Sequence, residues 1–130
     1  MQTLWVGTRK GLFAVRQEQG GWRIGKPSFP GEPVSQILVN PHDGACYAAL
    51  RLGHFGVKLW KSTDGGSTWT KLVGNGLPSG EYGRIGIAVY RKDPRILYVS
   101  IEQGARYNAS TAYTTRKAGL YRSNDRGATW

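Results

Sequence analysis

The strongest constraint on the fold is a short motif that occurs twice in the same form. Residues 62–69 read STDGGSTW and residues 123–130 read SNDRGATW, so the second copy follows the first at an offset of 61 residues. The shared positions are Ser62, Asp64, Gly66, Thr68 and Trp69 in the first copy, and Ser123, Asp125, Gly127, Thr129 and Trp130 in the second. A repeat with a spacing of this size, built of short strands, is typical of propellers and arrays.

The sequence before each motif is repeated as well. Residues 37–50 (ILVNPHDGACYAAL) resemble residues 87–101 (IAVYRKDPRILYVSI). A fainter copy, GLFAVRQEQGGW, lies at residues 11–22, where Gln17 and Gln19 stand in place of the Asp and the Gly. The chain is therefore expected to hold three related units, the first of them degenerate.

Short apolar stretches separated by Gly-rich turns predict strands, and no convincing helical period is present. Four antiparallel strands per unit make a propeller blade. We therefore expect an all-β fold of antiparallel β-propeller blades, with blade 1 at about 1–27, blade 2 at about 33–74 and an incomplete blade 3 at about 84–130. The strands are expected at 4–7, 11–16, 22–25, 34–40, 45–50, 57–62, 68–72, 84–90, 96–102 and 119–123.

The residue types of the motif suit a tight turn between the third and fourth strands of a blade. An Asp side chain such as Asp64 or Asp125 can accept backbone N–H groups of its own turn. The Gly two residues later permits a positive φ, and the Trp ring can pack on a neighbouring hairpin. Turn stability accounts for both carboxylates, so we expect a structural role for them.

The two copies resemble the Asp-box, or bacterial neuraminidase repeat, of pattern S-x-D-x-G-x-T-W. Sialidases, the sortilin ectodomain, family 74 xyloglucanases and photosystem II assembly factors carry such boxes, and the segment from Gly83 onward is most similar to the sialidase-like and sortilin-like groups. The resemblance implies a six- to ten-bladed propeller, of which these residues are expected to be an N-terminal part of about two and a half blades. Alone they are expected to be marginally stable or to aggregate, because open sheet edges would be exposed.

Composition and charge limit the classes of binding partner and the cellular compartment that we expect for this protein. The formal net charge is +10, but no run exceeds two adjacent basic residues, so a solvated basic surface is favoured over a nucleic-acid site. A single Cys46, and His42 and His54 without a third ligand, predict no metal and no cofactor. The N-terminus MQTLWVGTRKGLF does not read as a signal peptide and no long apolar run follows, which predicts a cytoplasmic protein without a membrane partner.

Functional sites of propellers usually form on the face that carries the second-to-third strand loops and the blade connections. In this chain that face carries the long segment 103–117, a candidate binding loop. Arginine forks suit carboxylate or phosphate ligands, and a pair of carboxylates suits glycoside hydrolysis. The ligand-binding candidates are Arg9, Arg51, His54, Tyr82, Arg84, Arg106 and Tyr107, and the catalytic candidates are Glu81 and Glu102.

Two functions remain open at this point. One is a binding or assembly propeller that takes a glycan or protein ligand on this loop face; the alternative is a sialidase-like glycoside hydrolase acting on anionic or plant-type glycans. Sialidases carry an Arg-Ile-Pro motif before their first box, and the nearest match, Arg84-Ile85-Gly86, follows a box and lacks the Pro. The binding propeller is therefore favoured, with its ligand and oligomeric state open.

Overall fold

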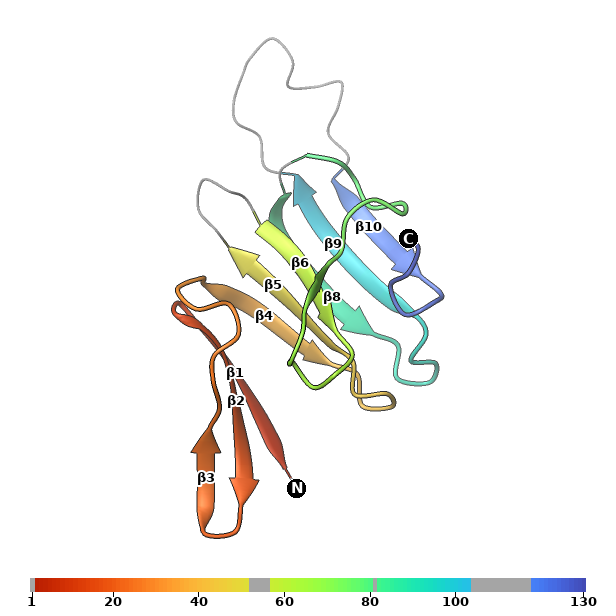
Figure 1. The fold of residues 1–130 in the computed structure, drawn as a ribbon. Coiled ribbons are helices and arrows are strands. Elements are labelled where there is room, and N and C mark those ends of the chain that lie inside the picture. Colours follow the sequence, from red (N-terminus) through yellow and green to blue (C-terminus); the bar gives the residue numbers. More distant parts are fainter. Residues whose placement is uncertain (1, 52–56, 81, 104–117) are drawn as a thin grey trace.

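The computed structural model describes residues 2–51, 57–80, 82–103 and 118–130. These residues form antiparallel sheets without any helix, which confirms the expected all-β class (Figure 1). A strand lies in every segment where one was expected. The strands are β1 (Thr3–Thr8), β2 (Gly11–Glu18), β3 (Gly21–Ile24), β4 (Val34–Val39), β5 (Cys46–Arg51), β6 (Val57–Ser62), β7 (Thr70–Lys71), β8 (Tyr82–Val89), β9 (Leu97–Gln103) and β10 (Gly119–Ser123).

The strands form three consecutive meanders. β1, β2 and β3 make a separate three-stranded sheet, β4 to β7 pair in chain order, and β8, β9 and β10 do the same. We call these the first, second and third units. A single residue pair between Val57 and Tyr82 joins the second and third units into one seven-stranded sheet, which the sequence did not predict. Within the described residues neither sheet closes on itself.

Strand β5 is the centre of the core because it is buried on both faces. Successive side chains of a strand point to opposite sides, so Tyr47 and Ala49 join one apolar cluster while Ala48 and Leu50 join another. The first cluster lies between the second and third units and includes Leu59, Ile85, Ile87, Leu97, Val99 and Ile101. The second lies between the first and second units and includes Leu12, Val34, Trp5, Phe29, Ile37, Trp60 and Trp69. The three units therefore pack face to face.

Hydrogen bonds of two side-chain amides also connect the second unit to the third. The Gln36 amide donates from Nε2 to the Ile87 carbonyl at 3.1 Å, and its Oε1 accepts the Ile87 N–H at 3.2 Å. One side chain thus satisfies the hydrogen-bonding capacity of both the N–H and the carbonyl of a β8 residue, as a neighbouring strand would. The buried Asn40 side chain donates to the Pro94 carbonyl at 3.0 Å and adds a second tie.

The turn after β6 is organised by the first copy of the motif. The Ser62 hydroxyl donates to Asp64 Oδ1 at 2.7 Å and accepts the Gly66 N–H at 2.9 Å. The Asp64 carboxylate also accepts the backbone N–H of Thr68 at 2.9 Å and its hydroxyl at 2.5 Å. Trp69 donates its indole N–H to the Gly66 carbonyl at 3.1 Å. Hydrogen bonds to Thr68 and then to Ser62 hold the pKa of Asp64 at about 2.

The turn after β10 repeats this geometry with the second copy. Ser123 Oγ donates to Asp125 Oδ1 at 2.7 Å and accepts the Gly127 N–H at 2.8 Å, and Asp125 accepts the N–H of Thr129 at 2.8 Å. The residue before the Gly is Arg126, which takes a left-handed φ of 59°. The degenerate first copy differs, because Glu18 pairs directly with Gly21 in a tight two-residue hairpin.

Each motif turn also contacts the unit that precedes it. In the first turn, the Gly66 carbonyl accepts a hydrogen bond from Ser28 of the first unit at 3.2 Å. In the second turn, the Arg126 carbonyl accepts hydrogen bonds from Tyr47 at 2.9 Å and Lys61 at 2.7 Å, both of the second unit. The turns therefore stabilise the packing between units as well as their own hairpins.

Candidate functional site

A pocket of about 470 Å³ opens where the second and third units meet. Four of the residues that the sequence singled out line it: Arg51, Tyr82, Arg84 and Glu102. The other lining residues are Ser35, Val57, Gly83 and Ile85. We call this cavity the loop-face pocket.

Strand direction explains why these residues meet. Arg51 ends β5 and Glu102 lies near the end of β9, whereas Tyr82 begins β8 and Ser35 lies at the start of β4. In antiparallel sheets the end of one strand lies beside the beginning of the next. Figure 1 shows the arrowheads of β5 and β9 at one end of the molecule, and those of β6 and β10, which lead into the motif turns, at the other.

The Glu102 carboxylate is held against the backbone of β8. Its Oε2 accepts the N–H of Arg84 at 3.3 Å. A Cβ built on Gly83 would lie 3.2 Å from the same oxygen and 3.0 Å from the Glu102 carbonyl oxygen. The close approach of this carboxylate therefore depends on the missing side chain at Gly83.

The two guanidinium groups of the pocket have no acidic partner in the described part of the chain. Arg51 and Arg84 are exposed, and the ion pairs found among the described residues involve other side chains. Glu102 bonds the backbone of Arg84 and not its guanidinium. Among the described residues the pocket thus holds two cations without an acidic partner beside one carboxylate, which suits a carboxylate-bearing ligand with hydroxyl groups.

Tyr82 and Ser35 shape the wall of the pocket. The buried Tyr82 hydroxyl donates to the Pro78 carbonyl at 2.6 Å, and burial, with a smaller contribution from Tyr121, raises its pKa. The Ser35 hydroxyl donates to the Ala49 carbonyl at 3.1 Å. Both hydroxyl hydrogens are already used, so these groups can accept a hydrogen bond from a ligand more readily than donate one.

The other candidates from the sequence do not join this group. Arg9 lies exposed in the turn between β1 and β2 and does not line the pocket. His54, Glu81, Arg106 and Tyr107 lie outside the described residues, as does most of the segment 103–117.

Sequence reasoning missed Ser35, Val57, Gly83 and Ile85 as lining residues. A usable signal was present for Ser35, Val57 and Gly83, because each of them lies at or next to the start of a strand, whereas Ile85 lies inside β8. The expected strand boundaries placed Ser35 and Val57 inside strands, where a structural role was the ordinary interpretation.

The described ranges 2–51, 57–80, 82–103 and 118–130 hold few features that suggest a metal site or a membrane span. No group of three or more His, Cys, Asp or Glu side chains there could hold a metal ion. His42 Nε2 lies 3.2 Å from the Arg91 carbonyl oxygen. Burial raises the pKa of the Cys46 thiol, with smaller contributions from Asp43 and Asp64. In the part of the chain that the structure describes, no helix has the length and apolar character needed to span a bilayer.

No protein-family model matches the chain, and no curated protein matches its sequence.

Proposed function

We propose that this chain is part of an Asp-box β-propeller that binds a carboxylate-bearing ligand, a glycan or an acidic protein segment, in its loop-face pocket. The observation that carries the proposal is that two guanidinium groups, Arg51 and Arg84, line one pocket and have no ion-pair partner among the described residues. A guanidinium can form two parallel hydrogen bonds to a carboxylate, which fixes its orientation as well as its position.

The propeller part of the proposal rests on the repeated packing of the units. Three antiparallel meanders lie face to face, and each motif turn contacts the preceding unit through a backbone carbonyl. The accepting carbonyl differs by one motif position, being Gly66 in the first turn and Arg126 in the second. In both cases the turn packs on the unit before it, and such packing can continue through further units.

A titration of the ¹⁵N-labelled chain with D-glucuronate tests the binding proposal, and D-glucose serves as the uncharged control. We expect the backbone amide signals of Gly83 and Arg84 to shift with glucuronate and to stay unchanged with glucose. A peptide ending in Asp-Glu distinguishes a protein ligand from a glycan. If neither carboxylate ligand moves these signals at millimolar concentration, the binding proposal is wrong.

A sialidase-like glycoside hydrolase is the second candidate, and the position of Glu102 favours it. This carboxylate lies in a pocket with two guanidiniums. Most glycoside hydrolases use a pair of carboxylates, and Glu81 is the candidate for the second. The test is the release of 4-methylumbelliferone from its sialoside, glucuronide and glucoside. The assay uses the full-length propeller, because about two and a half blades are not expected to be active alone. Turnover that is abolished by both Glu102→Gln and Glu81→Gln supports the hydrolase, and no turnover of any substrate by the full-length propeller excludes it.

A further inference from the structure

A second pocket, of about 400 Å³, lies between the first unit and the motif turn of the second unit. It is on the opposite end of the strands from the loop-face pocket, because the turn follows the end of β6. We call it the turn pocket. Its lining includes the aromatic residues Trp5, Phe29 and Trp69 and the basic residues Arg16 and Lys26.

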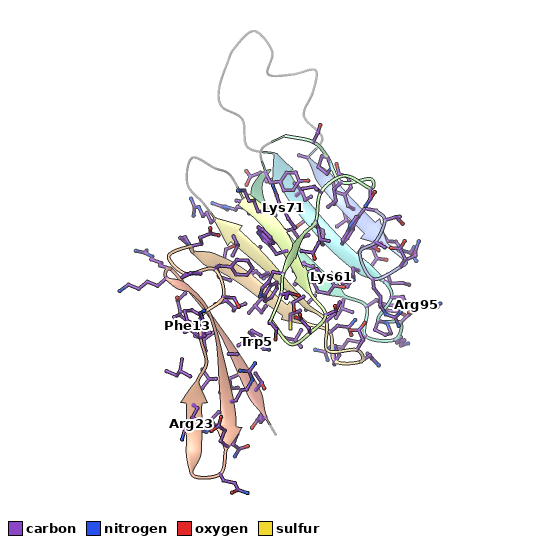
Figure 2. All side chains as sticks on the ribbon, in the orientation of Figure 1. Trp5, Phe13, Arg23, Lys61, Lys71 and Arg95 are labelled. Carbon is purple, nitrogen blue, oxygen red and sulfur yellow. The ribbon has the colours of Figure 1, made fainter. Side chains whose placement is uncertain are left out.

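Three aromatic rings form one side of the turn pocket. Trp5 meets Trp69 edge to face, with ring centroids 6.4 Å apart and planes at 87°. Phe29 packs against Trp69 at 5.0 Å. All three side chains are only partly buried, so part of their ring surface remains available to a ligand. Figure 2 shows Trp5 projecting from β1 toward the larger sheet.

The charge of the turn pocket is of one sign. Arg16 and Lys26 line it, and none of the described Asp or Glu residues does. Neither cation belongs to an ion pair among the described residues. A Cβ on Gly25 would lie 3.2 Å from a terminal nitrogen of Arg16, so the guanidinium rests on the backbone of that glycine.

The opposite wall is held in place by hydrogen bonds of the motif turn. Ser28 Oγ donates to the Gly66 carbonyl at 3.2 Å, and Ser67 Oγ donates to the Asp64 carbonyl at 3.1 Å. Both hydroxyl hydrogens are used within the protein. Arg16 and Lys26 are therefore the charged side chains of the pocket that can donate hydrogen bonds to a ligand.

We propose that the turn pocket binds an aromatic anion, a planar ring that carries a carboxylate or a phosphate group. The ring would lie against Trp5 and Trp69, since aromatic pairs stack offset or edge to face. The anionic group would accept charge-assisted hydrogen bonds from Arg16 and Lys26. At about 400 Å³ the cavity falls within the size range of small-molecule sites, and its lining combines aromatic rings with charged and polar groups.

The experiment follows the indole N–H signals of Trp5 and Trp69 in the full ¹⁵N-labelled chain, assigned with Trp→Phe variants. The probes are adenosine 5′-monophosphate and indole-3-acetate, which distinguish a phosphate from a carboxylate ligand. Adenosine, indole and inorganic phosphate supply the ring or the charge alone. We expect saturable shifts with at least one aromatic anion, and binding weaker by about ten-fold or more with each partial probe.

Variants separate the pocket from general charge. Arg16→Gln combined with Lys26→Gln should weaken binding about ten-fold, whereas Arg23→Gln should not, because Arg23 lies outside the pocket and pairs with Glu18 at 2.7 Å. Unmoved Trp5 and Trp69 signals with both aromatic anions would overturn the proposal, as would equal binding by the double variant or by any partial probe. Gly83 and Arg84 signals report the loop-face pocket separately.

Discussion

The indole ring of Trp5 lies directly over the backbone of Gly66. A Cβ placed on Gly66 would lie 2.4 Å from Trp5 Cη2, and the residue has a positive φ of 83°. The shared Gly of the motif therefore serves two purposes. It permits the left-handed turn, and it lets a ring from the preceding unit approach the turn closely.

Gly66→Ala is expected to lower the free energy of unfolding by about 2–4 kcal/mol, because it adds overpacking to left-handed strain. Urea denaturation measures the change. Gly65→Ala is the matched control, since Gly65 also has a positive φ, of 67°, but a Cβ there meets nothing within 4 Å. It should cost only about 1 kcal/mol. Equal losses in the two variants would show that the Trp5 contact is unimportant.

Gln36→Leu is expected to destabilise the chain by about 2 kcal/mol, because the N–H and the carbonyl of Ile87 both lose their partner. The change in the urea midpoint measures it. Gln17→Leu on the exposed end of β2 is the control and should change the stability by less than about 0.5 kcal/mol. A Gln36→Leu variant as stable as the wild type would contradict the described bridge between β4 and β8.

Tyr47→Phe removes a hydroxyl that donates to the Arg126 carbonyl. The expected loss is about 1 kcal/mol or less, because Lys61 still donates to the same carbonyl oxygen. Adding Lys61→Met should cost more than the sum of the two single changes, since the carbonyl then has neither donor. Thermal or urea denaturation of the four proteins gives this coupling, and strict additivity would refute it.

Acid is expected to destabilise the motif turns in a defined pH range. Hydrogen bonds lower the pKa of Asp64 and of Asp125 from 3.8 to about 2. A carboxyl group whose pKa falls on folding stabilises the protein above its unfolded pKa, and that contribution is lost as the pH falls toward the folded pKa. The free energy of unfolding should therefore decrease between about pH 4 and pH 2.

The double variant Asp64→Asn and Asp125→Asn should flatten this pH dependence. It should not abolish it, because hydrogen bonds from Arg95 also hold the pKa of Asp93 at about 2. Urea denaturation at several pH values between 2 and 7 provides the comparison. The same slope in the variant as in the wild type would mean that the turn carboxylates do not bind their partners more tightly when ionised.

The strands could be predicted because each one is an apolar stretch closed by a local turn signal, as Asp43-Gly44 closes the approach to β5. That Arg51, Arg84 and Glu102 lie on one face could also be anticipated, because the antiparallel order within each unit places their strand ends on the same side. The features that depend on packing between units could not be predicted from the sequence. The Val57–Tyr82 pair and the turn pocket depend on how two units pack, and no local pattern encodes that arrangement.

The central claim is that Arg51 and Arg84 bind a carboxylate, and the affinity for D-glucuronate of a variant lacking both guanidiniums tests it most directly. We expect Arg51→Gln combined with Arg84→Gln to weaken binding at least ten-fold, as followed by the Gly83 amide signal. Arg122→Gln, outside the pocket, should leave the affinity unchanged. An unchanged affinity in the double variant, with its spectrum showing the native fold, would contradict the account.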